Sequence, residues 1–285
     1  MRAAAILGPG NLARPMIAFQ RATQVQWTSL IEQADVAVIF GGDGTVHRHL
    51  ATLVEIEIPV LVVPCGSGND FARTLGIRNV RDAIAAMRHF EAHGKTRAID
   101  LGVIRPFIVG AAAAQHTYFC CVAGVGLDSV INRSANGLPR WLRGHGGYAL
   151  CASREFVRFA PFPMKVPPNG TQAAFRPTLL AAVANAPTYG GGMKIAPQAK
   201  LDDGKLDLCV VRSMNPFKLF CLFPTVYFGR HLGFKEIEYS QIPTVGIETE
   251  FPFDVYADGE YICQTPVEFS VARHALKVVA AISGV

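Results

Sequence analysis

The apolar residues of this chain follow two different patterns, one in each part. In the first hundred residues, short apolar runs alternate with stretches whose apolar positions recur every three or four residues. The runs predict buried strands at residues 3–7, 36–40 and 60–63, and the periodic stretches predict helices at residues 47–55, 70–75 and 80–92, the last ended by Gly94. This alternation is typical of an α/β domain built on a parallel sheet.

From residue 98 onward, strand-like runs separated by turn residues dominate, and they predict an antiparallel β-sandwich or barrel. The predicted strands are residues 98–103, 117–123, 178–184, 205–211, 235–239, 244–248, 253–257, 267–272 and 276–281, interrupted by helical insertions at residues 138–159 and 216–228. We therefore expect a two-domain α/β + β protein: an N-terminal α/β domain, residues 1–97, and a β-rich domain, residues 98–272.

The composition narrows the class of protein. Half of the 285 residues are hydrophobic, yet no window holds about 20 uninterrupted apolar residues, and residues 107–127 suit strands better than a membrane helix. The net charge of +5 favours nucleotides or anionic lipid surfaces, and no basic stripe with interleaved aromatics indicates nucleic-acid binding. Seven scattered cysteines and a start without a signal peptide indicate a reduced, cytoplasmic protein with cysteines mostly in the core.

The first candidate site follows the apolar run at residues 36–40. It reads Gly41, Gly42, Asp43, Gly44 and Thr45. Glycines directly after a buried strand allow a tight turn, and free backbone N–H groups there can cradle a phosphate. A carboxylate beside phosphate needs a metal ion or a proton to handle, so Asp43 indicates phosphoryl transfer. The alternative for this segment alone is an ordinary tight turn.

A second glycine loop follows the next apolar run and reads Gly66, Ser67, Gly68, Asn69 and Asp70. Two such loops in tandem, each with an aspartate and a hydroxyl residue, favour a pair of phosphate cradles at the carboxyl edge of one sheet. Asn69 and Asp70 begin a predicted helix. They are therefore either N-capping residues or, in the case of Asp70, a group directed at metal or substrate.

Gly-Gly-Asp-Gly-Thr followed by Gly-Ser-Gly-Asn-Asp-Phe-Ala-Arg resembles the diacylglycerol kinase catalytic family, which includes soluble bacterial lipid kinases and the sphingosine and ceramide kinases. The order and spacing of further motifs match the family from about residue 36 to the end of the chain. These motifs are residues 99–102, 124–128, 185–187, 190–193, 196–204, 229–231 and 258–260. The resemblance implies that the domain of residues 1–97 binds ATP and the domain of residues 98–272 binds lipid. It also implies that the final strand segment, residues 273–285, returns to the first domain.

The resemblance implies an ATP site on both glycine loops. Its residues would be Gly41, Gly42, Asp43, Gly44, Thr45, Val46, His47, Gly66, Ser67, Gly68 and Asn69, with Thr28 as a further contact. Thr45 stands at a helix start, where its hydroxyl could cap the helix or contact phosphate. The segment before the first loop, which helps relatives to hold adenine and ribose, is shorter here than in the family.

The acceptor side of the predicted reaction depends on residues 258–260. In the resembled family, the residue matching Glu260 takes the proton of the acceptor alcohol, which is a poor nucleophile until it loses that proton. Asp258 is the second candidate, as base or as electrostatic support, and Asp43 is the third carboxylate. From the residues alone, Asp-Gly-Glu is a common hairpin turn.

A further site lies in the turn at residues 200–205. The resemblance implies a Mg²⁺ site formed by the side chain of Asp203 and the backbone carbonyls of Lys200 and Lys205, distinct from the Mg²⁺ bound with ATP. From the residues alone this is a solvated turn. Residues 140–143 and 156–165 mix aromatics with cations, which indicates either a membrane-contacting edge or core packing with exposed arginines.

Together these features predict an ATP- and Mg²⁺-dependent lipid kinase that associates peripherally with membranes and phosphorylates the primary hydroxyl of a diacylglycerol-like lipid. The alternatives are a sphingoid-base or ceramide kinase, an NAD kinase, or a non-catalytic lipid- or nucleotide-binding protein. Homodimer formation is left open.

Overall fold

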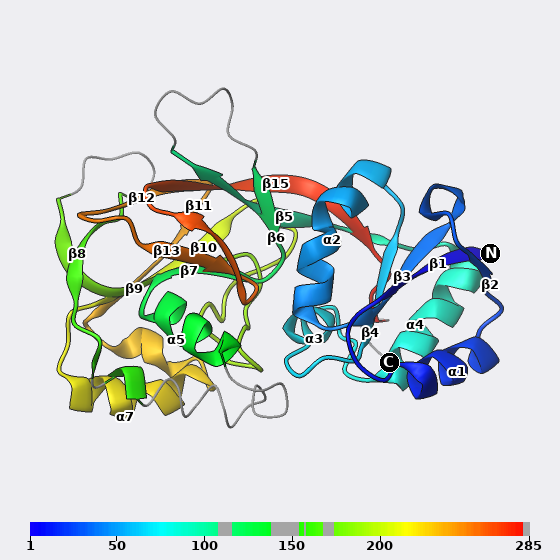
Figure 1. Cartoon of the computed structure of the whole chain (residues 1–285), viewed down its shortest axis with the longest axis horizontal. Coiled ribbons are helices and arrows are strands. Elements are labelled where there is room, and N and C mark those ends of the chain that lie inside the picture. The colour runs from blue at the N-terminus through cyan, green and yellow to red at the C-terminus, as the bar shows by residue number, and fades with distance from the viewer. Residues whose placement is uncertain (108–115, 138–153, 157, 168–173, 282–285) are drawn as a thin grey trace. The chain divides into compact units, whose positions relative to one another are not determined.

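The computed structural model describes residues 1–107, 116–137, 154–156, 158–167 and 174–281 (Figure 1). The chain folds as two compact units. Unit 1 comprises residues 1–100 and the end of the chain from Arg273, and unit 2 comprises residues 101–272. Two strands, β5 (Arg97–Pro106) and β15 (Val267–Val278), belong partly to each unit.

Unit 1 contains a parallel sheet with the strand order β4-β3-β1-β2. Its strands are β1 (Arg2–Leu7), β2 (Gln26–Thr28), β3 (Val36–Gly41) and β4 (Val60–Pro64). The central strand β3 is buried over its whole length, as a nearly continuous apolar run requires when helices cover both faces of a parallel sheet. In register, Leu7 lies opposite Phe40 and Gly41 lies opposite Pro64, so these strands end at one edge.

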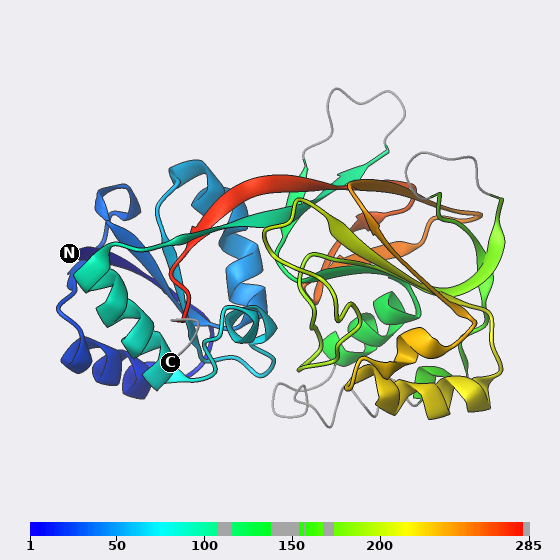
Figure 2. The same ribbon diagram turned by 180° about the vertical axis from the view of Figure 1, so that it is seen from behind.

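The strand order determines on which face of the sheet the helices of unit 1 lie. They are α1 (Ala13–Ala22), α2 (Asp43–Ile56), α3 (Asp70–Thr74) and α4 (Val80–His93), with a short 3₁₀ turn at Ile31–Gln33. The chain moves from β1 to β2 in one direction and from β3 to β4 in the other, so right-handed crossovers place α1 and α2 on opposite faces. Helix α4 packs against α1 and β4, as Figures 1 and 2 show. The predicted α/β architecture with parallel strands is confirmed.

Unit 2 is an antiparallel β-sandwich, as predicted. Its further strands are β6 (Thr117–Phe119), β7 (Val122–Gly126), β8 (Phe162–Lys165), β9 (Arg176–Ala184), β10 (Leu206–Arg212), β11 (Ile237–Ile242), β12 (Thr244–Thr249), β13 (Asp254–Ala257) and β14 (Glu260–Gln264). Side chains such as Phe119, Val183, Leu208, Ile247 and Phe269 form its core. Helices α5 (Leu127–Asn136) and α7 (Pro216–Val226) and a 3₁₀ turn, η3 (Arg230–Gly233), accompany the sheet.

Several elements differ from the sequence expectation. Helix α2 begins at Asp43 rather than at residue 47, because Gly42 is its N-cap and the segment expected to be loop is already helical. Strand β15 is one strand of 12 residues, where two were expected. It passes through His274, whose φ of 51° is left-handed and whose N–H donates to Asp100 Oδ1 at 2.7 Å.

Other elements were absent from the expectation. Helix α1 buries a single residue, Phe19, and β2 has only three residues. The strand expected at residues 117–123 is divided into β6 and β7 at Cys120 and Cys121. Most of the helical insertion expected at residues 138–159, including the aromatic and cationic motif at 140–143, lies outside the described residues.

No helix among the described residues is long and apolar enough to cross a membrane.

The sandwich core gives a stability prediction. A Cβ on Gly102 in β5 would lie 2.0 Å from the ring of Phe119, which is fully buried and lies opposite in β6. We expect Gly102→Ala to lower the free energy of unfolding by about 1–3 kcal/mol through overpacking, as measured by denaturant titration.

Gly246→Ala is the matched control, because Gly246 also lies in a strand and a Cβ added to it would meet the ring of Phe107 only at 4.0 Å. Equal stability losses in the two variants would contradict the steric explanation.

Candidate active site

The two glycine loops of unit 1 touch each other at the edge of the sheet. They follow β3 and β4, which are adjacent, and the N–H of Cys65 donates to the carbonyl of Gly41 at 2.9 Å. A Cβ on Gly42 would lie 2.9 Å from the Cα of Gly66, and a Cβ on Gly66 would lie 2.6 Å from the Cα of Gly42. The φ of Gly42 is −115°, so this glycine is required by the contact between the loops rather than by a left-handed backbone.

Asp43 joins the two loops. Its two carboxylate oxygens accept hydrogen bonds from the backbone N–H groups of Asp70 and Phe71, both at 3.0 Å. These are the first N–H groups of α3, so Asp43 caps that helix from a different loop and places a negative charge at its positive end. A residue expected to take part in chemistry therefore has a structural role that the sequence did not reveal.

The second loop is closed by its own side chains. Asn69 has a left-handed φ of 54°, and its side-chain amide bonds to both the N–H and the carbonyl of Gly66, at 2.9 and 2.6 Å. Asn69 is the N-cap residue of α3, as one of the two interpretations predicts, but its side chain makes no capping hydrogen bond.

Asp70 is paired inside the structure. It is 2% exposed and accepts a hydrogen bond from Arg73 at 2.6 Å, and Arg73 also donates to the carbonyl of Gly68 at 2.9 Å. Arg73 thereby links the buried carboxylate to the second loop. Removing the arginine would leave a buried charge without this partner, which is strongly unfavourable.

The remaining expected ATP residues differ in exposure. Gly66 and Ser67 are exposed, and His47 is half-buried. Thr45 and Val46 are buried, and Thr45 packs against Gly41 and Gly8. Helix α2 begins at this point without a side-chain cap, and an uncapped helix N-terminus is an anion-binding arrangement.

Thr28 is set apart from the glycine loops. It ends the outermost strand β2 and lies opposite Ala4, three residues before the register position of Leu7. Its hydroxyl accepts the N–H of Leu30 at 3.3 Å.

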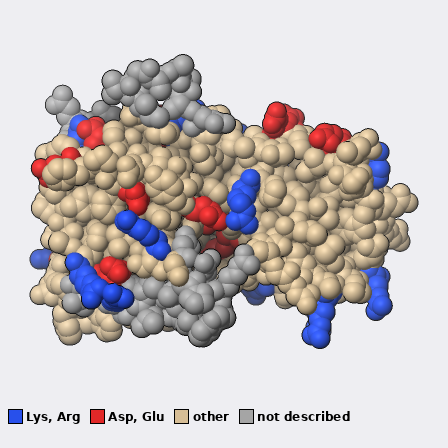
Figure 3. All heavy atoms as spheres, viewed as in Figure 1, with Lys and Arg blue, Asp and Glu red and all other residues tan. Residues whose placement is uncertain are grey.

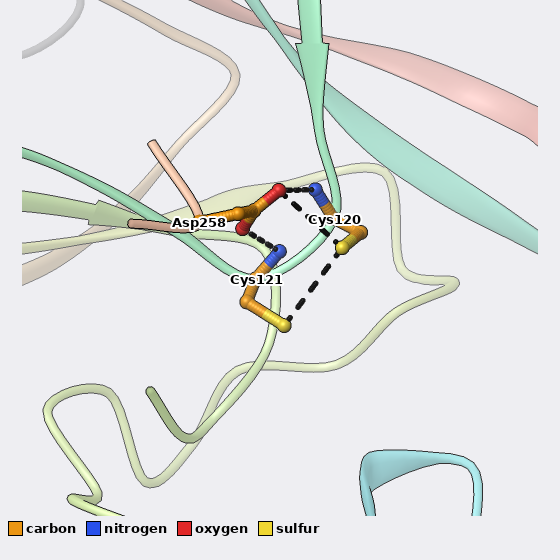
Figure 4. Close-up of side chains that lie close together, drawn as sticks. All are labelled: Cys120, Cys121 and Asp258. Carbon is orange, nitrogen blue, oxygen red and sulfur yellow. Dashed lines mark hydrogen bonds between the residues drawn. The ribbon is translucent and has the colours of Figure 1, made fainter. Parts of the chain in front are cut away.

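In unit 2, Asp258 binds the backbone of the corner between β6 and β7 (Figure 4). One carboxylate oxygen accepts the N–H of Cys120 at 2.9 Å, and the other accepts the N–H groups of Cys121 and Val122 at 2.8 and 3.3 Å. Asn185, from the predicted Asn-Ala-Pro motif, adds a bond from its side chain to the carbonyl of Cys120 at 3.2 Å. The corner is thus held from two sides.

The same three side chains, Cys120, Cys121 and Asp258, bring their donor atoms within 4.8 Å of one another. The thiols are 3.9 Å apart and the sulfur of Cys120 is 3.4 Å from Asp258 Oδ2. Because both carboxylate oxygens already accept backbone N–H groups, backbone capping explains this cluster without a metal ion. Apart from the adjacency of the cysteines, no sequence signal pointed to it.

The turn at residues 258–260 connects β13 to β14. Asp258 and Gly259 have φ values of 51° and 86°, and Ala257 pairs with Glu260 across the turn. Two consecutive positive φ values are those of a tight hairpin turn of type I′, for which Asp-Gly is a favoured sequence. Glu260 is the first residue of β14 and is half-buried.

The predicted cation turn contains an additional carboxylate. Asp203 Oδ1 accepts the N–H of Lys205 at 3.1 Å. Asp207, which follows in β10, is fully buried, and its Oδ1 accepts the hydroxyl of Tyr239 at 2.5 Å. Asp207 Oδ2 has no hydrogen-bond partner among the described residues.

Burial raises the pKa of Asp207, with the charge of Asp203 as a smaller cause in the same direction. A buried carboxyl oxygen without a hydrogen-bond partner among the described residues, near a second carboxylate, suits a hard divalent cation, so the residues fit the metal expected here. Sequence reasoning missed Asp207, because a lone aspartate in an apolar strand resembles a residue on its solvent face.

Unit 2 also contains an apolar pocket. It is bounded by the inner face of α7 through Leu219, Leu222, Phe223 and Val226. Its polar groups include Asp128 and His231. His231 is fully buried, and its Nε2 bonds to the carbonyl of Ile195 at 3.0 Å, whereas Nδ1 has no partner among the described residues. Burial lowers the pKa of His231, which favours the neutral ring with Nδ1 as an acceptor.

Comparison with known proteins identifies the family. The diacylglycerol kinase catalytic domain matches residues 18–104, and the YegS C-terminal NAD kinase beta sandwich-like domain matches residues 121–280. The chain belongs to the diacylglycerol kinase family of lipid kinases. The family resemblance inferred from the glycine loops is confirmed, and the chain is an enzyme of the kinase class.

Relatives of this lipid kinase family cover most of the chain. The diacylglycerol kinase of Mycobacterium tuberculosis is 35% identical over 244 residues, which cover 86% of this chain and 76% of that protein. A YegS-like lipid kinase of Chromohalobacter salexigens is 29% identical over 225 residues, covering 77% and 68%. The crystal structure of a proposed diacylglycerol kinase from Bacillus anthracis strain Sterne matches with a TM-score of 0.73 and 24% identity, covering 100% and 96%, which supports the fold.

The cation turn gives a pH prediction. Burial raises the pKa of Asp207 in the folded protein above its unfolded value near 3.8, so folding favours the protonated form. This contribution to stability is fully present below the unfolded pKa and is lost as pH rises through the folded pKa. In chelator, Asp207→Asn should therefore gain stability relative to wild type as pH rises from 4 to 8, measured as Tm.

Mg²⁺ should reduce this difference by stabilising the wild type. A site held at 100 times its dissociation constant contributes about 2.7 kcal/mol, and Asp203→Asn should lose this gain. A wild-type Tm that is the same in Mg²⁺ and in chelator would contradict a cation site in the turn.

Proposed function

We propose that this kinase transfers the γ-phosphoryl group of Mg·ATP to the primary hydroxyl of a diacylglycerol-like membrane lipid. The observation that carries the proposal is the pair of glycine loops that Asp43 joins beside the uncapped N-terminus of α2. Backbone N–H groups at such a terminus can bind phosphate oxygens without a competing side chain. Phosphoryl transfer requires mainly this positioning, together with neutralisation of charge.

In this proposal, the residues of unit 1 bind and orient ATP. Gly41, Gly42 and Gly44 let the backbone approach the phosphates, and Ser67 donates from the exposed second loop. Asp43 and the pair formed by Asp70 and Arg73 hold the two loops at a fixed separation. Mg²⁺, when bound with ATP, would neutralise negative charge on the phosphates.

The acceptor would be a lipid, because the pocket of unit 2 is walled by apolar side chains with few polar groups. The apolar walls suit part of an acyl chain, although the cavity volume of about 50 Å³ is smaller than a whole chain. The name of the Mycobacterium tuberculosis relative supports diacylglycerol among the lipid classes.

Glu260 is the proposed general base and Asp258 a positioning residue. Both oxygens of Asp258 accept backbone N–H groups, so this carboxylate fixes the hairpin that presents Glu260. Glu260 would take the proton of the acceptor hydroxyl as that oxygen attacks the γ-phosphorus and the bond to the β-phosphate oxygen breaks. Asp203 and Asp207, with the carbonyls of Lys200 and Lys205, would hold a second cation that stabilises unit 2.

A transfer assay with radiolabelled ATP tests the proposal. The panel comprises diacylglycerol, ceramide, sphingosine and NAD, each presented in mixed micelles or buffer as its solubility requires. Diacylglycerol should be phosphorylated fastest. Faster transfer to ceramide, sphingosine or NAD would replace the proposed acceptor, and no transfer to any of them would favour a non-catalytic binding protein.

The base assignment gives a prediction about two neighbouring carboxylates. Glu260→Gln should keep its Tm and ATP affinity but lose about 10²–10⁴-fold in kcat, because only proton removal is impaired. It should also flatten the acidic limb of the pH profile. Asp258→Asn should lose activity together with Tm, because the amide cannot accept all three N–H groups.

Tyr261→Phe is the control, since Tyr261 follows Glu260 in β14 and is 53% exposed. If Asp258→Asn were inactive at an unchanged Tm while Glu260→Gln kept full activity, the base would be Asp258.

The nucleotide side has a separate prediction. Ser67 is exposed at the tip of the second loop, so Ser67→Ala should leave Tm unchanged and raise the KM for ATP about 2–10-fold, the effect of one lost hydrogen bond. Steady-state kinetics at saturating lipid would measure this. An unchanged KM would remove Ser67 from the nucleotide contacts.

A further inference from the structure

Helix α7 is apolar on two opposite faces. Its inner face, Leu219, Leu222, Phe223 and Val226, lines the pocket of unit 2. A helix with this sequence would ordinarily be buried all round. Here the other face is exposed to solvent, although Lys218 is the only charged residue of the helix.

The exposed face forms a continuous stripe. Its residues are Phe217, Phe220, Cys221, Pro224 and, just beyond the helix, Phe228, at the spacing of three and four residues that places side chains on one side. Phe217, Phe220 and Phe228 are 77%, 57% and 72% exposed. We call these five residues the α7 stripe. Isolated exposed apolar residues are common, but an aligned group marks an interaction site.

Several cationic residues belong to α7 or to segments next to it. Lys194 donates its backbone N–H to the carbonyl of Val226, and the helical residues 154–156 contact α7 through the rings of Phe156 and Phe223, 5.0 Å apart. The cations in or near these segments are Arg154, Lys194, Lys218, Arg230 and Lys235. Their described acids are Glu155 and Glu236, and Lys218 pairs with Glu236 at 2.7 Å. In Figure 3, Lys and Arg side chains lie near the lower left edge, with an Asp or Glu side chain among them.

We propose that the α7 stripe inserts into the interface of an anionic lipid bilayer. Aromatic side chains flanked by cations are the arrangement by which proteins bind such surfaces. The three phenylalanines together expose about two whole phenylalanine residues, roughly 400 Å². This is about half of what one partner buries in a standard protein interface of roughly 800 Å². The area is therefore small for a stable dimer and sufficient for shallow insertion.

Insertion would place one face of α7 in lipid while the other face lines the pocket. The inference goes beyond the proposed reaction, because it concerns a surface and names its partner. Binding to vesicles needs neither ATP nor turnover, so failure of the kinase assay and failure of docking are separate results.

Vesicle co-sedimentation tests the proposal with the full-length protein. We expect binding to vesicles of phosphatidylcholine with phosphatidylglycerol, weaker binding to phosphatidylcholine alone, and weakening by salt. The double variant Phe217→Gln/Phe220→Gln should bind the anionic vesicles about tenfold more weakly than wild type, with unchanged Tm. Ile17→Gln is the matched control, since Ile17 is an apolar residue of α1 that is 51% exposed, and it should bind like wild type.

Cys221 provides an independent probe because it is exposed within the α7 stripe. Its alkylation by a membrane-impermeant maleimide, identified by comparison with Cys221→Ser, should slow when vesicles are added. The proposal would be overturned by wild-type binding equal to that of the double variant, by equal binding to the two vesicle types, or by an unchanged alkylation rate. A wild-type dimer that the double substitution converts to a monomer would overturn it too, since a second copy would then cover the stripe.

Discussion

The carboxylate of Asp43 is the constraint on which the nucleotide side of this kinase depends. Asp43 follows β3, and its carboxylate accepts the first two N–H groups of α3. The loop after β4, which leads into α3, therefore cannot move without breaking two hydrogen bonds to a charged group. The backbones of Gly42 and Gly66 are in close contact, so no side chain fits between the two loops at this point. Pre-organisation of this kind is what phosphoryl transfer requires, because the protein contributes position and charge rather than covalent chemistry.

Unit 2 also contains an aspartate whose carboxylate accepts several backbone N–H groups. Asp258 binds three N–H groups of the corner at Cys120 and Cys121, and it thereby fixes the hairpin in which Glu260 stands. Two aspartates in family motifs thus hold backbone segments in place through hydrogen bonds to N–H groups. Asp207 shows the opposite case, because one of its buried oxygens has no partner among the described residues. The motif letters alone do not separate these roles, since each is an aspartate near a turn.

The sequence predicted those parts of the fold that depend on local periodicity and on turn chemistry. The buried runs of β3 and β4 and the left-handed Gly94 after α4 produce strong local signals. Elements that depend on contacts distant in sequence were missed. Helix α1 buries only Phe19, and the chain divides β6 from β7 because Asp258, 138 residues away from Cys120, binds the backbone there. Backbone N–H groups that are distant in sequence likewise determine which carboxylates have a structural role.

The two apolar faces of α7 address a physical problem that any kinase with a water-insoluble acceptor must solve. A buried methylene group is worth about 0.8 kcal/mol relative to water, so exposing a sixteen-carbon acyl chain on its way to a pocket would cost roughly 12 kcal/mol. A pocket whose wall is a helix that also touches the bilayer shortens the path through water. Each exposed phenylalanine of the α7 stripe lies within two residues, along the chain, of an inner side chain that lines the pocket. In the proposed docking, one helix would contact both the bilayer and the pocket, so an acyl chain would cross little water between them.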